Sequence, residues 1–177
     1  MDIPADTGSP RHWPIASPTA VAYWQAMPFP ASPLMARALD EARVAGARGE
    51  VPVGAVVCDA AGLVIAAAGN RTRELGDPTA HAEILAIRAA CEALSSERLT
   101  GCDIHVTLEP CPMCAAAIGY ARLARLYYGA SDPKSGGVEQ GARVFAHASC
   151  HHAPQVYGGI GGEAAAALLR EFFAARR

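Results

Sequence analysis

The chain has 177 residues, of which 51% are hydrophobic, and a formal net charge of −2. This length corresponds to one domain with a sizeable core, and no apolar run reaches the ~20 residues that a membrane-spanning helix needs. The small net charge excludes nucleic-acid binding driven by bulk positive charge, although it leaves room for a local basic groove. The N-terminus has no basic segment followed by an apolar stretch, so we expect a cytoplasmic protein.

The first 33 residues differ in composition from the rest of the chain. They contain seven of the thirteen prolines and show no helical period. We therefore expect residues 1–33 to form a disordered N-terminal arm and residues 34–177 to form the folded domain. Trp13, Tyr23 and Trp24 could dock a partner, although an idle tail fits the composition better.

From residue 34 onward, helical and strand patterns alternate. Apolar residues at helical spacing predict helices over 34–49, 79–94, 111–122 and 162–177. Short apolar runs predict strands over 51–59, 63–70, 102–108, 124–130 and 155–160. The first two strands form a hairpin, and the charged, glycine-containing segments 71–78 and 131–137 are loops. This order favours a central sheet with helices on both faces.

The helix predicted over 79–94 carries polar residues where it begins. His81 and Glu83 lie in its first turn, whereas Ile84, Leu85 and Ile87 are available for a core. Taken alone, His81 and Glu83 could serve as ordinary cap and dipole residues. They could equally be a metal ligand and a proton carrier.

The next helix begins with a pair of cysteines in the run PCPMC. Cys111 and Cys114 are three positions apart, which places both sulfurs on one helix face. Pro110 and Pro112 suit a first helical turn, where the helix dipole favours the metal-binding thiolate. With His81 the cysteines form a set of three zinc ligands, which leaves the fourth tetrahedral position open for water, as in catalytic zinc sites.

Glu83 distinguishes a catalytic site from a structural one. Two residues from His81, it can reach a zinc-bound water without binding the metal, and a carboxylate that takes and returns a proton suits hydrolytic displacement. A structural zinc site has no use for Glu83 and would need a fourth ligand. That ligand could be Cys102 or Cys150, or a second histidine such as His105 or His147.

The combination of motifs resembles bacterial tRNA-specific adenosine deaminases, within the cytidine and deoxycytidylate deaminase superfamily. The stretches that carry the resemblance are VPVGAVV (51–57), GNR (69–71), DPTAHAEI (77–84), VTLEPCPMC (106–114) and YGASDPKSG (128–136). The resemblance covers the chain from about residue 34 to its end. It implies a three-layer α/β/α fold with a mixed five-stranded sheet, and a cytoplasmic homodimer that binds one zinc ion per subunit.

The resemblance also implies a reaction and a set of site residues. The reaction is the hydrolytic conversion of adenosine to inosine at the wobble position of a tRNA anticodon, in which a zinc-bound hydroxide attacks the purine while Glu83 carries protons. His81, Cys111 and Cys114 would hold zinc, and Asn70 would hydrogen-bond the base. The base would be framed by the backbone of Ala82 and by Val51, Pro52 and Pro110. Asp132 and Lys134 would lie along the nucleic-acid strand.

One segment departs from the family pattern. Gly119 and Tyr120 stand where the tRNA enzymes have a polar run, in a region that borders either the base or a dimer contact. This sequence is also similar to that of guanine deaminases, which act on the free base. The loop 131–137 and the basic ending with Arg170, Arg176 and Arg177 favour tRNA. A structural-zinc nucleic-acid-binding protein is the remaining alternative.

Other cysteine and aromatic residues have simpler interpretations. Cys150, His151 and His152 are adjacent in the sequence, so an exposed loop is a better interpretation than a second metal site. Cys58, Cys91 and Cys102 should fill the core. Tyr127 and Tyr128 should lie in the core on a strand.

Overall fold

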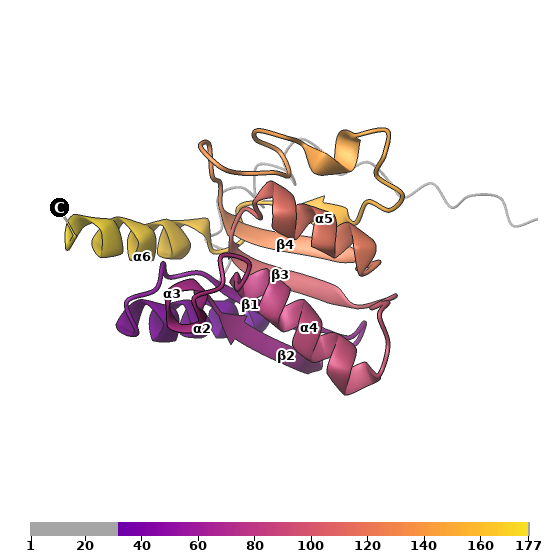
Figure 1. Ribbon diagram of the computed structural model, residues 1–177, viewed down its shortest axis with the longest axis horizontal. Helices are drawn as coiled ribbons and strands as arrows, with labels where there is room; N and C mark the ends of the chain where they lie inside the picture. The colour runs from indigo at the N-terminus through magenta and orange to yellow at the C-terminus, as the bar shows by residue number, and fades with distance from the viewer. Residues whose placement is uncertain (1–31, 177) are drawn as a thin grey trace, which may run out of the picture.

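The computed structural model describes residues 32–176 (Figure 1). The predicted N-terminal arm, with Trp13, Tyr23 and Trp24, lies outside the described residues, as does Arg177. No helix of the described part is long and apolar enough to cross a membrane.

A mixed sheet of five strands forms the centre of the fold, as predicted. The strands are β1 (Gly54–Cys58), β2 (Val64–Gly69), β3 (Asp103–Leu108), β4 (Arg125–Ala130) and β5 (Gln155–Tyr157). Their order in the sheet is β2-β1-β3-β4-β5. β1 pairs antiparallel with both β2 and β3, whereas β3, β4 and β5 run parallel. Because β1 reverses direction between them, β2 and β3 both end at the same edge of the sheet.

Helices cover both faces of the sheet, which confirms the three-layer α/β/α fold. The helices are α2 (Pro33–Ala47), α3 (Thr72–Leu75), α4 (Ala82–Leu94), α5 (Pro112–Tyr120) and α6 (Gly162–Ala174). Figure 1 shows α4 and α5 in front of the sheet and α2 behind it. The larger apolar cluster lies under α4 and α5, and a second cluster joins α2 and α6 to the other face.

The helices adjoining the polar motifs begin later than the sequence predicts. Helix α4 starts at Ala82 rather than at residue 79, because Asp77 accepts hydrogen bonds from the backbone and hydroxyl of Thr79, each at 2.7 Å, and holds a turn there. Helix α5 starts at Pro112. His81 and Cys111 are therefore the N-cap residues of the two helices, with extended backbone.

The predicted loop 71–78 contains a short helix, α3. The buried carboxylate of Glu50 accepts hydrogen bonds from the Thr72 hydroxyl at 3.1 Å and from the backbone N–H groups of Arg73 and Glu74 at 2.9 Å. The two N–H donors are free groups of a helix start, which a carboxylate satisfies well. Glu50 therefore fixes a turn that local sequence alone does not specify.

Small residues determine how closely the helices approach the sheet. In α4 the fully buried residues include Ala82, Ala86 and Ala90, whereas Ile84 and Leu85 are only half-buried. A Cβ on Gly54 of β1 would lie 2.1 Å from the carbonyl oxygen of Ala38, so only glycine fits where α2 crosses this strand. The close packing on both faces holds the sheet edge rigidly.

The other predictions about cysteines and tyrosines are largely confirmed. Cys58 and Cys102 are buried and Cys91 is half-buried, and all six cysteines of the chain are free. Tyr128 is buried, but Tyr127 is only partly covered, between the rings of His105 and Tyr157 at centroid separations of 4.5 and 4.8 Å. Tyr127 thus belongs to an aromatic stack across three strands rather than to the apolar core.

Candidate active site

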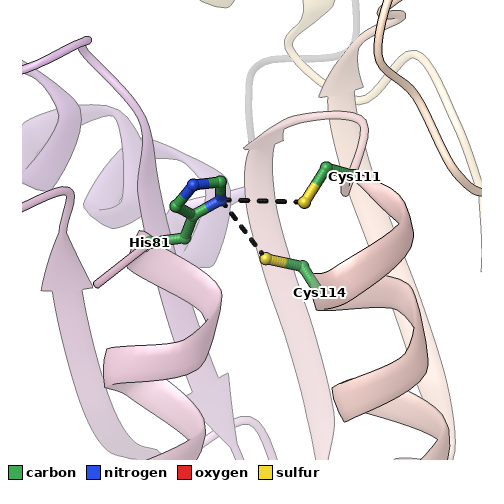
Figure 2. Close-up of side chains that lie close together, drawn as sticks. All are labelled: His81, Cys111 and Cys114. Atoms are coloured by element: carbon green, nitrogen blue, oxygen red, sulfur yellow. Dashed lines mark hydrogen bonds between the residues drawn. The ribbon is translucent and has the colours of Figure 1, made fainter. Parts of the chain in front are cut away.

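Two helix starts meet at the edge where β2 and β3 end. His81 caps α4, Cys111 caps α5, and Cys114 lies in the first turn of α5. Because both helices begin just after this edge, residues thirty positions apart in the chain become neighbours. Figure 2 shows the imidazole of His81 facing both sulfurs across the gap between the helices.

The distances within this group fit a zinc ion. His81 Nδ1 lies 3.7 Å from Cys111 Sγ and 3.5 Å from Cys114 Sγ, and all three atoms lie within 4.8 Å of one another. Nitrogen and sulfur ligands of a tetrahedral zinc ion lie roughly 3.6 Å apart, from the usual bond lengths. The three predicted ligands therefore match zinc in chemistry and in spacing. No other such group occurs among residues 32–176.

The electrostatics of the group favour a bound cation. A hydrogen bond from Cys114 lowers the pKa of Cys111 to about 4, and the hydrogen bond with His81 acts in the same direction. The hydrogen bond with Cys111, together with burial, raises the pKa of Cys114. A divalent cation held by both sulfurs would favour their thiolate forms.

Glu83 lies beside the ligand group and is buried, with 3% of its surface exposed. Burial raises its pKa, which hydrogen bonds from its own backbone and from Cys114 only partly offset. A buried carboxyl group with a raised pKa is suited to accept and return a proton. The role of Glu83 as a proton carrier stays a prediction, and its burial beside the His–Cys–Cys group is consistent with it.

Asn70 connects the segment before β1 to the start of α4. Its side-chain oxygen accepts a hydrogen bond from the backbone N–H of Ala82 at 2.8 Å, and its amide donates to the carbonyl of Val51 at 3.1 Å. Pro52 and Pro110 are buried and Val51 is half-buried. Asn70 thus links Val51 to the start of α4, and Pro110 directly precedes Cys111 at the start of α5; that these residues frame a base stays a prediction.

The loop predicted to follow a nucleic-acid strand lies against the turn that carries Cys111. The N–H of Gly137 donates to the carbonyl of Pro110 at 2.8 Å. Asp132 is half-buried and Lys134 is exposed. The buried Glu109 holds this loop, and its only signal in the sequence is a carboxylate directly before the PCPMC run.

Cys150, His151 and His152 do not form a metal group. His152 Nε2 lies 2.6 Å from the carbonyl oxygen of Leu123, Cys150 donates to the carbonyl of His152 at 3.1 Å, and His151 is exposed. Arg122 donates to the carbonyl of His151 at 3.0 Å. The segment is thus a loop tied to the end of α5, which confirms the simpler interpretation.

The site and the fold agree with a known family. Residues 30–130 match the family model of the cytidine and deoxycytidylate deaminase zinc-binding region. The layered sheet and the His–Cys–Cys group are thus those of a zinc-binding deaminase domain.

Individual relatives narrow the class. The chain is 62% identical to a tRNA-specific adenosine deaminase of Agrobacterium fabrum over 81% of this chain and 93% of the relative. It superposes on a solved tRNA:A34 deaminase, studied for A-to-I editing at the wobble position, with a TM-score of 0.75 and 62% identity, covering 77% of this chain and 98% of the other. A guanine deaminase from Nitrosomonas europaea gives a TM-score of 0.69 and 28% identity, covering 81% and 86%. The chain belongs to the tRNA-specific adenosine deaminase family.

The ligand group predicts how zinc content depends on single cysteines. We expect Cys111→Ala to lower the zinc-to-protein ratio of dialysed protein from about one toward zero, because two ligands hold zinc poorly. The matched control is Cys150→Ala, which removes another half-buried cysteine and should leave the ratio unchanged. Elemental analysis of both variants measures this, and equal ratios would refute the assignment of Cys111 as a ligand.

Proposed function

We propose that the protein is a zinc-dependent hydrolase that converts adenosine to inosine at the wobble position of a tRNA anticodon, with one zinc ion per subunit. The observation that carries this proposal is the 62% identity to a tRNA-specific adenosine deaminase over 93% of that relative's length. The His–Cys–Cys group beside a buried carboxyl supports it independently.

We propose that His81, Cys111 and Cys114 hold the zinc ion. When bound, zinc supplies a Lewis acid that makes water a nucleophile at neutral pH. Glu83 would act as the general acid and base. Its carboxylate would accept a proton from the attacking water and deliver it to N1 of adenine, next to carbon 6. A second proton carried by Glu83 would allow ammonia to leave.

We propose that Asn70 orients the base. Its amide has two N–H groups and its oxygen two lone pairs, of which Val51 and Ala82 engage one each. One donor and one acceptor therefore remain for a purine edge. Ala82, Val51, Pro52 and Pro110 would frame the base, and Asp132 and Lys134 would line the path of the RNA strand.

The departure at Gly119 and Tyr120 lies away from this site. Tyr120 is the last residue of α5, six residues beyond Cys114, and six residues of helix span roughly 9 Å. Tyr120 lines a groove of about 870 Å³ that none of the three ligands borders. The change therefore gives no reason to prefer a free-base substrate.

The substrate assignment is tested by a paired assay. Purified protein is incubated with an anticodon stem-loop that bears a wobble adenosine and, separately, with guanine, and inosine and xanthine are measured. We expect inosine from the stem-loop and none from a stem-loop with cytidine at that position. Xanthine without inosine would instead assign a guanine deaminase. If neither inosine nor xanthine forms, the result would favour the structural-zinc alternative.

The role of Glu83 is tested by Glu83→Gln. We expect kcat on the stem-loop to fall at least about 100-fold, because general acid–base catalysis contributes on that order, while the zinc content stays that of the wild type. Glu92→Gln, an exposed position on the same helix, should retain activity. Wild-type turnover by Glu83→Gln would exclude the proton-carrier role.

We also propose a cytoplasmic homodimer. The groove beside α5 supports this, because it is bordered by Tyr120, which is 80% exposed and offers an apolar surface to a second copy. Light scattering should give about twice the chain mass of 18.3 kDa. Tyr120→Arg should shift the protein toward monomer, whereas Val44→Arg, at another exposed apolar position on α2, should not. A monomeric wild type would refute the dimer.

A further inference from the structure

A buried carboxylate joins the metal-binding turn to the loop beside it. Glu109 is the second residue before Cys111, and only 2% of its surface is exposed. Its two oxygens face residues 131–140, which follow β4 and carry Asp132 and Lys134. Glu109 lies too deep to touch a nucleic acid, so any influence on the substrate must act through this loop.

The carboxylate is surrounded by donors from the loop. One oxygen accepts hydrogen bonds from the backbone N–H groups of Val138, Glu139 and Gln140 at 3.2, 2.9 and 2.9 Å. The other accepts from the Ser131 hydroxyl at 3.2 Å and the Asp132 N–H at 3.1 Å. Both ends of the loop thus converge on a single side chain.

Steric contact reinforces these hydrogen bonds. A Cβ on Gly136 would lie 2.6 Å from the Glu109 carboxylate, and one on Gly137 would lie 2.5 Å from the backbone nitrogen of Pro112. The loop backbone therefore packs directly on the turn that holds Cys111. Its far end is also tied to β4, because the Tyr128 hydroxyl donates to the Glu139 carboxylate.

The part of the loop opposite Glu109 faces outward. Asp132 accepts hydrogen bonds from the N–H groups of Lys134 and Ser135, both at 3.0 Å, and so closes a turn. Pro133, Lys134 and Ser135 are exposed. The outward turn therefore projects from a loop base that Glu109 ties to the turn carrying Cys111.

We propose that Glu109 is a positioning residue for the polynucleotide substrate: it fixes residues 131–140 against the metal-binding turn, so that RNA lying along Asp132 and Lys134 presents its base to the site. This inference rests on the proposed function. It assigns Glu109 to substrate alignment, with no part in metal binding or proton transfer.

Few side chains could replace Glu109 in this role. A carboxylate has two acceptor oxygens and no donor, which suits a pocket lined only by donors. Glutamine would turn an NH2 group either toward the N–H groups of residues 138–140 or toward the Ser131 hydroxyl and the Asp132 N–H. In either orientation at least one backbone N–H of the loop loses its acceptor. Aspartate keeps the charge, but it is one methylene shorter and cannot reach both ends of the loop.

The experiment compares Glu109→Gln with a matched control, Asp103→Asn. Asp103 lies at the opposite end of β3, is 5% exposed and pairs with Arg125 at 2.8 Å. Asp103→Asn therefore also removes a buried negative charge and its ion pair. The measurements are hydrogen exchange at the amides of Asp132 and residues 138–140, zinc content, and KM and kcat on the anticodon stem-loop. Exchange and zinc content need no substrate.

We expect the loop amides to exchange faster in Glu109→Gln while β3 and α5 keep their protection. KM for the stem-loop should rise about tenfold, because lost contacts with a charged group misplace the loop, and kcat should change less than about threefold. Glu109→Asp should give a smaller rise in KM and provides the same comparison if the glutamine variant does not fold. Asp103→Asn should retain the wild-type KM and loop protection.

Some outcomes would overturn this inference. These are a wild-type KM in both Glu109 variants, an activity loss that follows zinc loss, or a fall in kcat with KM unchanged. A wild-type protein that converts guanine but not RNA would overturn the proposed function instead, and its loop exchange would still report whether Glu109 anchors residues 131–140.

Discussion

The structure depends on one geometric constraint, the meeting of two helix starts at one edge of the sheet. β1 runs antiparallel to both of its neighbours, so β2 and β3 end together and the segments that follow them lead to the N-termini of α4 and α5. His81 and Cys111 sit on those N-termini as cap residues. The N-terminal ends of two helix dipoles therefore lie at the His–Cys–Cys group, where negative charge on sulfur is stabilised.

Three buried glutamates near this edge have different environments. Burial raises the carboxyl pKa at each of Glu50, Glu83 and Glu109, but at Glu50 and Glu109 backbone hydrogen bonds outweigh it and the pKa is lowered. Those two stay ionised and hold loops. At Glu83 burial dominates, which leaves a carboxyl group able to exchange protons. The donors around each carboxyl group thus separate two loop anchors, Glu50 and Glu109, from Glu83, for which we propose the role of proton carrier.

The sequence predicted the layered fold and the ligand group because both leave periodic or spaced patterns. The number and order of the strands, the hairpin and the meeting of His81, Cys111 and Cys114 were predicted correctly, although β5 ends at Tyr157 rather than at residue 160. The predicted starts of α4 and α5 were early by three residues and one residue. At α4 the hydrogen-bonded turn at Asp77 prevents an earlier start, and at α5 Cys111 is the N-cap residue, which lies outside the helix. α3 was missed because Glu50, more than twenty residues earlier, satisfies its N–H groups. Glu109 was missed for the same reason, since its partners are backbone groups of a distant loop that no residue pattern marks.

The loop beside the zinc ligands separates two kinds of position. Ser131, Gly136 and the backbone of 138–140 are fixed by contacts with Glu109. The side chains of Pro133, Lys134 and Ser135 are exposed and enter none of the hydrogen bonds or ion pairs found within residues 32–176. Substitutions at the exposed positions should therefore cost little folding stability. With RNA along the proposed path, new substrate preferences could evolve at the tip of the loop while its base, held by Glu109, stays unchanged.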